Sequence, residues 1–214
     1  MPHRLLRPLR LIATCSTVGI ILLFGWLNSR PADFPAQEGF PLLMASMVLS
    51  LSLMALPLLP GLLGEPGRLR RWFALPAGGW RFWFRLAGGF ALLLLGASAL
   101  VEVMAPEEEQ AMVRLLATLT PPQLAVAAVF LCVFTPLIEE CLCRGILLET
   151  VRPALALPLS AALFAFAHGF NAFLLPLFFM GWCLGLLTLR TRTLLPAILL
   201  HGSFNLVSLC LTGC

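Results

Sequence analysis

Charged residues are scarce in this chain. Of its 214 residues only 11% are charged, while 60% are hydrophobic. A soluble domain of this length carries about 25% charged residues. The shortage excludes an ordinary soluble domain, and the long apolar runs between short polar stretches predict a polytopic membrane protein. The sequence shows no internal repeat, no low-complexity tract and no soluble second domain.

Cysteine pairs with a recognisable spacing are also lacking. The seven cysteines lie mostly within the apolar runs, and none has the C-x-x-C spacing of a zinc site or of a secreted disulfide framework. Cys141 and Cys143 are close in sequence, but side chains two residues apart point to different faces of a helix. We therefore expect small buried hydrophobic residues rather than metal ligands.

The N-terminus begins like a signal peptide, with Arg4, Arg7 and Arg10 before an apolar stretch. The stretch is long for a signal peptide, and no A-x-A-like cleavage site follows it. We expect a retained signal-anchor helix.

The lengths of the apolar runs, roughly 17–25 residues, predict seven membrane-spanning helices. The fourth is expected to continue as a helix to about residue 152. The predicted fold class is therefore all-α, with three spans in an N-terminal part (residues 1–121) and four in a core (residues 122–212). The expected spans cover residues 9–27, 41–63, 86–105, 122–143, 154–170, 172–190 and 193–212.

Arginine-rich loops alternate along the chain with loops that are acidic or lack arginine. The positive-inside rule then predicts a cytoplasmic N-terminus and a C-terminus outside. The basic tail and signal anchor favour a bacterial inner membrane. Residues 68–85 mix arginine with tryptophan and phenylalanine, which next to spanning helices predicts a segment in the lipid interface rather than a nucleic-acid site. Residues 105–122 are expected to form a short outer amphipathic helix.

Glutamate and arginine occur together in the fourth span, as Glu139-Glu140-x-x-x-Arg144. Each such charge costs about 2.5–3.5 kcal/mol at the centre of a spanning helix. Glu140 and Arg144 are four residues apart on a helix and can form an ion pair. Glu139 is rotated by about 100° from Glu140. One glutamate is thus neutralised, and the other is available for chemistry.

Two further polar clusters interrupt the later spans. His168 lies one helical turn after Phe164 and precedes Gly169, which is expected to end the helix, and His201 and Asn205 share one face of the last span. Taken alone, a histidine in an apolar helix is usually a hydrogen-bonded packing residue.

The depth of each polar cluster in the membrane can be estimated from the rise of the helices. A turn is expected at residues 152–153, because proline disfavours continuation of the helix. At 1.5 Å per residue, Glu139 and His168 each lie about 20–23 Å from that turn. By the same rise, His201 and Asn205 lie about 14 and 20 Å from their own basic loop. We expect all four side chains to converge within the membrane.

The chemistry of such a set favours hydrolysis. A carboxylate beside a neutral imidazole can hold and deprotonate a water molecule. A second imidazole and an amide can donate to a developing oxyanion. No serine or cysteine is placed with a histidine in a way that favours a covalent nucleophile. The set indicates attack of water on a peptide carbonyl.

In this order, the three motifs resemble the type II CAAX prenyl protease family, also called CPBP or ABI-domain intramembrane proteases. The family pattern is E-E-x-x-x-R, F-x-x-x-H and H-x-x-x-N or H-x-x-x-D, and the match covers about residues 122–210. The resemblance implies a helical bundle and a glutamate-type endopeptidase. In such an endopeptidase, Glu139 would activate water with help from His168, while His201 and Asn205 would form the oxyanion site. The supporting residues would be Glu140, Arg144 and Phe164.

The resemblance also bears on cofactors and substrates. Two glutamates and two histidines could hold zinc, but Asn205 and the paired Arg144 favour a metal-free site without a cofactor. The expected partners are the lipid bilayer and a membrane-anchored protein or peptide. Its C-terminus would be processed, either in the CAAX manner or by trimming of a C-terminal anchor, and no nucleic acid is expected.

Two other functions fit parts of the sequence. A non-catalytic membrane scaffold or bacteriocin self-immunity factor would tolerate Glu139→Gln and His168→Ala. A proton-coupled transporter could use the same intramembrane glutamate and histidine residues as a relay. The chain shows no paired halves of the usual transporter kind.

Overall fold

The structure is a computed structural model, and it describes most of the chain. The described residues are 3–29, 39–63, 65, 67–76, 81–82, 85–86, 88–89, 92–93, 96, 116–170 and 173–211. Every regular element within these residues is helical, so the predicted all-α class is confirmed.

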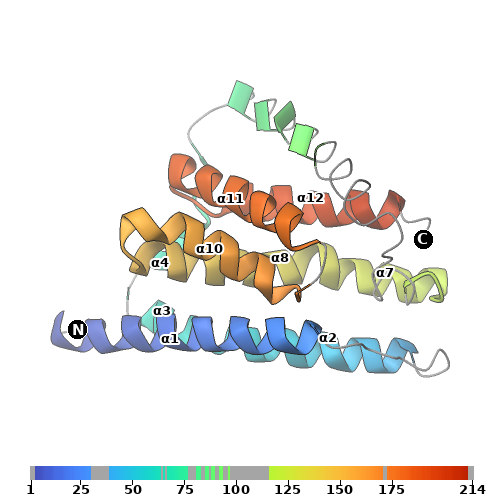
Figure 1. Cartoon of the computed structure of the whole chain (residues 1–214), viewed down its shortest axis with the longest axis horizontal. Helices are drawn as coiled ribbons and strands as arrows, with labels where there is room; N and C mark the ends of the chain where they lie inside the picture. The colour runs from blue at the N-terminus through green and yellow to red at the C-terminus, as the bar shows by residue number, and fades with distance from the viewer. Residues whose placement is uncertain are drawn as a thin grey trace.

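The N-terminal helices line one side of the bundle (Figure 1). Helix α1 (His3–Asn28) runs along its full length, and α2 (Gly39–Ala55) returns beside it towards the short helix α3 (Leu58–Leu63). A five-residue helix, α4 (Arg68–Trp72), follows at the end of the bundle where α1 begins.

One long helix crosses the middle of the bundle. Its start is fixed by a capping box, in which the backbone N–H of Thr120 donates to the side-chain oxygen of Gln123 over 3.0 Å. The helix contains two π-helical segments, and all seven residues of the second are buried. Its successive segments are α7 (Pro121–Val129), η2 (Phe130–Phe134), α8 (Thr135–Glu140), η3 (Cys141–Leu147) and α9 (Leu148–Thr150).

The last three helices pack against this central helix. Helix α10 (Pro153–Ala167) begins at a proline, whose ring fixes a helical φ and whose missing N–H is not needed in the first turn. It ends at Ala167, and Gly169 two residues later has φ 96°, which confirms the predicted break. Helix α11 (Leu174–Thr191) packs on α10, and α12 (Leu195–Leu211) packs on η2, α8 and α11.

The helices are long and apolar enough for an integral membrane protein. Within the described residues, four helices could cross a membrane: Pro8–Asn28, Phe40–Leu63, Pro121–Thr150 and Leu174–Thr191. Helices α10 and α12, on the predicted fifth and seventh spans, are shorter apolar helices. The predicted third span (86–105) and outer helix (105–122) lie outside the described residues, apart from a few positions.

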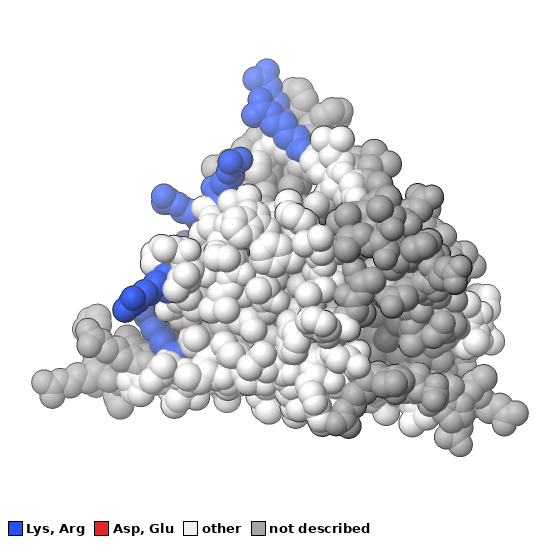
Figure 2. Space-filling model, in the orientation of Figure 1, with Lys and Arg blue, Asp and Glu red and all other residues white. Residues whose placement is uncertain are grey.

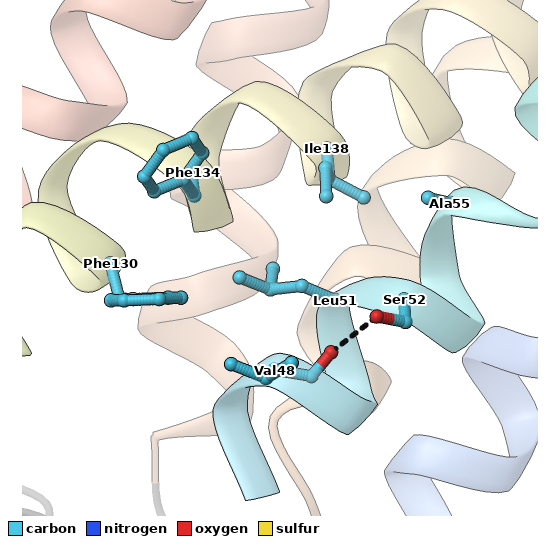
Figure 3. Close-up of a pocket in the computed structure, with 7 residues that line it drawn as sticks. All are labelled: Val48, Leu51, Ser52, Ala55, Phe130, Phe134 and Ile138. Carbon is cyan, nitrogen blue, oxygen red and sulfur yellow. Dashed lines mark hydrogen bonds between the residues drawn. The ribbon is translucent and has the colours of Figure 1, made fainter. Parts of the chain in front are cut away.

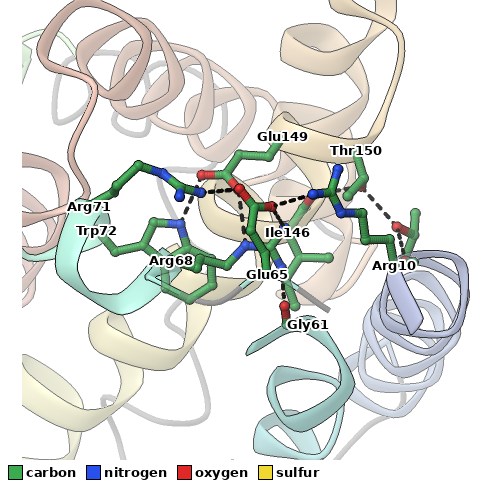
Figure 4. Close-up of polar contacts among 10 residues, drawn as sticks. Arg10, Gly61, Glu65, Arg68, Arg71, Trp72, Ile146, Glu149 and Thr150 are labelled. Carbon is green, nitrogen blue, oxygen red and sulfur yellow. Dashed lines mark hydrogen bonds and ion pairs between the residues drawn. The ribbon is translucent and has the colours of Figure 1, made fainter. Parts of the chain in front are cut away.

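A cluster of charged side chains ties several helices together at the end where α1 begins (Figure 4). Glu65 pairs with Arg10 over 3.2 Å, with Arg68 over 2.8 Å, and with Arg71. Arg68 is only 1% exposed, and its Nε lies 3.1 Å from Glu149 at the end of the central helix. We call this group the basic-end cluster; it comprises Arg10, Glu65, Arg68, Arg71, Trp72 and Glu149.

The Glu65 pairs predict a dependence of stability on pH. Burial raises the pKa of the Glu65 carboxyl, but the charges of Arg68, Arg71 and Arg10 together outweigh burial and hold the pKa below its ordinary value of 4.5. A carboxyl with a lowered pKa in the folded state contributes stability that is complete above its unfolded pKa. That contribution is lost as pH falls through the folded pKa.

We therefore expect the Tm difference between wild type and Glu65→Gln to be largest at neutral pH and to shrink as pH falls below about 4.5. Thermal unfolding of both proteins in the same detergent between pH 7 and pH 3 measures this. A Tm difference that stays constant over the whole range would show that the charge on Glu65 contributes nothing.

Candidate active site

Glu140 is the centre of a buried polar cluster between the central helix, α11 and α12. Its Oε1 accepts from Arg144 Nη1 over 3.0 Å, which confirms the ion pair predicted from their spacing. The same oxygen lies 3.0 Å from Nδ1 of His201. Glu140, Arg144 and His201 are 0%, 1% and 2% exposed. A buried charge is tolerated only when paired, and this one has two partners.

Arg144 is held by more than its glutamate. Its Nη2 donates to the backbone oxygen of Gly181 on α11 over 2.8 Å. The guanidinium carbon lies 4.5 Å from the centre of the Phe164 ring, within the range of a cation–π contact. Arg144 thus connects the central helix to α10 and α11.

Glu139 also lies in this cluster but is held differently. It is 8% exposed, and its Oε2 is 3.7 Å from Nε2 of His201. Within the described part of the chain, this buried oxygen has no hydrogen-bond partner. The His201 ring therefore lies between both glutamates, with Nδ1 on Glu140 and Nε2 towards Glu139.

The ring proton of His201 follows from these contacts. Glu140 is paired with Arg144, so its carboxylate accepts and Nδ1 of His201 must donate. In the neutral ring, Nε2 is then an acceptor that faces the carboxylate oxygen of Glu139. Two acceptors at this separation can share one donor molecule such as water.

Phe164 is the common neighbour of the histidines. Its ring centre is 5.0 Å from that of His168 and 5.4 Å from that of His201, the latter in an edge-to-face arrangement. The spacing F-x-x-x-H explains the local geometry, because His168 Nδ1 lies 2.9 Å from the carbonyl oxygen of Phe164, one helical turn earlier. A carbonyl only accepts, so Nδ1 carries the proton and Nε2 of the neutral ring is an acceptor.

Asn205 lies one turn after His201 on α12. Its Nδ2 donates to the carbonyl oxygen of Leu131 in the π-helical segment η2 over 2.8 Å. An amide nitrogen carries two N–H groups, so one remains for another acceptor. Helix α12 can approach η2 because position 202 is glycine: a Cβ there would overlap the carbonyl oxygen of Cys132.

The structure thus joins Glu139, Glu140, Arg144, His201 and Phe164 through direct contacts, and His168 through Phe164. Asn205, one turn after His201 on α12, contacts the backbone of η2, and no direct contact with the cluster is described for it. The sequence did not predict that the backbone oxygens of Gly181 and Leu131 would accept hydrogen bonds from site residues. For the Gly181 oxygen the sequence does contain a signal, because the spacing Gly181-x-x-x-Gly185 permits close helix packing. No sequence signal indicates the π-helical segment that presents the Leu131 oxygen.

The side chains of this site can be compared with the ligands that a zinc ion requires. Among the described residues, no group of three or more His, Cys, Asp and Glu side chains is arranged to hold a metal ion. One oxygen of Glu140 is already shared by Arg144 and His201. The donor set of the described residues does not fit zinc, and a cofactor-free site stays a prediction.

An apolar groove lies beside this cluster, between α2 and the central helix (Figure 3). Its volume is about 320 Å³. The hydroxyl of Ser52 is turned to its own helix, where it donates to the carbonyl of Val48 over 2.7 Å. Ile138 in the wall directly precedes Glu139 in sequence. The lining residues are Val48, Leu51, Ser52, Ala55, Phe130, Phe134 and Ile138.

Comparison with known proteins agrees with this site. Residues 121–207 match the family model described as type II CAAX prenyl endopeptidase Rce1-like. No curated protein and no solved structure matches the chain. The matched segment carries all seven predicted site residues, and at the level of the family it supports a CAAX-type protease in the membrane. Residues 121–207 of this integral membrane protein are therefore similar to the type II CAAX prenyl endopeptidase family.

Proposed function

We propose that the protein is a glutamate-type intramembrane endopeptidase that hydrolyses a peptide bond near the C-terminus of a membrane-anchored protein or peptide. The observation that carries the proposal is Glu139 itself. It is a buried carboxylate with an oxygen that no described group hydrogen-bonds, and it faces an imidazole nitrogen at 3.7 Å. Glu140, one residue later, has its Oε1 bonded to Arg144 and His201, while its own Oε2 also lacks a described hydrogen-bond partner.

In the proposed reaction, Glu139 removes a proton from a water molecule whose oxygen attacks the peptide carbonyl carbon. Nε2 of His168 accepts the second hydrogen of that water and orients it. As the carbon–oxygen bond forms, negative charge develops on the carbonyl oxygen. The remaining N–H of Asn205 donates to it. His201 adds a second donor at Nε2 when its ring has taken up a proton from solvent before the attack, with Nδ1 still donating to Glu140. The carbon–nitrogen bond then breaks, and Glu139 returns its proton to the leaving amine.

Glu140, Arg144 and Phe164 are positioning residues in this proposal. Glu140 holds Nδ1 of His201, Arg144 fixes Glu140, and Phe164 packs against both histidine rings. The apolar groove next to Ile138 suits the hydrocarbon part of the substrate or of its anchor, because its wall offers almost no polar surface.

The arrangement of the ends supports a cytoplasmic N-terminus. In Figure 2 the arginine side chains gather on the side of the bundle where α1 begins, and the opposite end is where α12 finishes (Figure 1). With the basic end in the cytoplasm, as the positive-inside rule requires, the C-terminus lies outside. We propose this orientation in a bacterial inner membrane.

The experiment that tests the function uses the purified full chain in lipid. Membrane-anchored peptides with varied C-termini are incubated with it, and the products are identified by mass spectrometry with and without a strong chelator. We expect a single type of cleavage that the chelator leaves unchanged. Loss of cleavage on chelation, restored by zinc, would overturn the metal-free mechanism. Absence of any product, together with an in-cell phenotype that survives Glu139→Gln, would favour the scaffold function instead.

A further inference from the structure

Exposed arginines gather at the end of the bundle where α1 begins (Figure 2). The carboxylates described at this end, Glu65 and Glu149, are both occupied within the basic-end cluster. These two carboxylates do not balance the exposed arginines, so the described part of this surface is positive. Exposed arginines at this end include Arg10, Arg70, Arg71, Arg152, Arg190 and Arg192.

Helix α4 adds apolar side chains to this positive surface. Its residues Arg68 and Trp72 point inward and are 1% and 2% exposed. On its outer side, Leu69 is 51% exposed and Phe73 40% exposed, and Leu75 just beyond is 80% exposed. Exposed apolar side chains next to arginine are typical of a segment at the boundary between headgroups and acyl chains.

The position of α4 in the chain agrees with that boundary. The second membrane-crossing helix ends at Leu63, a few residues before α4. Glu149, which pairs with Arg68, belongs to the last turn of the central helix. Two membrane-crossing helices therefore end at the level of α4.

The α4 segment is also attached firmly to helices that carry the site. The indole N–H of Trp72 donates to Glu149 over 2.9 Å. The indole ring occupies the space that a Cβ at Gly145 would need, one residue after Arg144. The carbonyl oxygen of Trp72 accepts from the hydroxyl of Thr193 over 2.7 Å and from the backbone N–H of Leu194 over 2.8 Å, just before α12.

From these contacts we propose that the outer face of α4, formed by Leu69, Arg70, Phe73 and Leu75, is a docking surface for anionic phospholipid headgroups. The apolar side chains insert between acyl chains, and Arg70 binds the phosphate. Arg70 has no ion-pair partner among the described residues, so its charge is available to a lipid. The inference does not depend on the proposed catalytic function, because lipid binding needs no substrate.

The test records which lipid lies against α4. Phe73 is replaced by p-benzoylphenylalanine in the full chain, in nanodiscs with equal amounts of phosphatidylglycerol and phosphatidylcholine. After irradiation, the cross-linked lipids are identified by mass spectrometry. One arginine near an anionic surface is worth about fivefold in binding. We therefore expect phosphatidylglycerol adducts to exceed phosphatidylcholine adducts by about fivefold.

Matched variants separate charge from position. Arg70→Gln should bring the adduct ratio close to one, whereas Arg70→Lys should keep most of the preference. The same photoreactive residue at Phe179, 52% exposed in the middle of α11, should show no preference. Equal adducts of both lipids at position 73 would overturn the proposal. Cross-links from that position to a second copy of the chain would overturn it too, by showing that α4 faces protein.

Discussion

Replacement of Glu139 by Gln should reduce the rate of peptide cleavage by about 10²–10⁴-fold, because general-base catalysis contributes that much and a neutral amide cannot take a proton from water. Folding should change little, since Oε2 of Glu139 has no hydrogen-bond partner among the described residues that the amide would lose. Single-turnover cleavage of the preferred membrane-anchored peptide measures the rate, and thermal unfolding measures the stability.

Two matched variants make this result specific. Glu149→Gln makes the same chemical change in the basic-end cluster, outside the site, and should leave the cleavage rate within a few-fold of wild type. Glu140→Gln removes the charge that pairs with Arg144, so it should lower stability as well as rate. If Glu139→Gln cleaved at the wild-type rate, Glu139 could not be the base, and the proposed mechanism would be wrong.

The second large effect concerns Arg144. In Arg144→Met, the carboxylate of Glu140 stays buried with 0% exposure and loses its partner, and the carbonyl of Gly181 loses its donor. Removing one partner of a buried ion pair costs about 3–5 kcal/mol. We expect a large drop in Tm and loss of cleavage, measured by thermal unfolding in detergent and by the peptide assay.

A double variant distinguishes a lost charge pair from a general packing defect. Glu140→Gln combined with Arg144→Met removes both charges and should recover a substantial part of the stability that Arg144→Met alone loses. Arg144→Lys should be intermediate, because an ammonium group cannot bind Glu140 and Gly181 with the same planar fork. An Arg144→Met protein that unfolds at the wild-type temperature would contradict a structural role for this pair.

Local features of the site were predictable from the sequence because they depend on spacing along one helix. Glu140 and Arg144 face each other four residues apart, and His168 bonds the carbonyl of Phe164 by the same spacing. The turn before Pro153 follows from the restricted backbone of proline. Each of these features is decided within a few residues, so nearby sequence contains the information.

Contacts between distant segments were not predictable in detail. The estimate of depth brought Glu139 and His201 to a similar level. It could not indicate that the imidazole of His201, which lies 61 residues from Glu140 in sequence, would contact both glutamates. The basic-end cluster joins residues from three helices with Glu65 from the segment between α3 and α4, and sequence indicated only that arginine is abundant there. Such contacts depend on how helices rotate and slide against each other, which hydrophobic run lengths do not encode.

Composition and spacing alone thus identified an all-helical membrane protein, its ion pair and the residues of its candidate active site, because the bilayer demands apolar spans and makes each buried charge conspicuous. The tertiary structure revealed which groups those residues contact. Oε1 of Glu140 is bonded to Arg144 and His201, whereas the contact described for Glu139 is the 3.7 Å approach of its Oε2 to His201. That difference between two adjacent glutamates arises from the packing of α12 and α11 around the central helix, because only packing brings distant donors to one carboxylate and not to its neighbour.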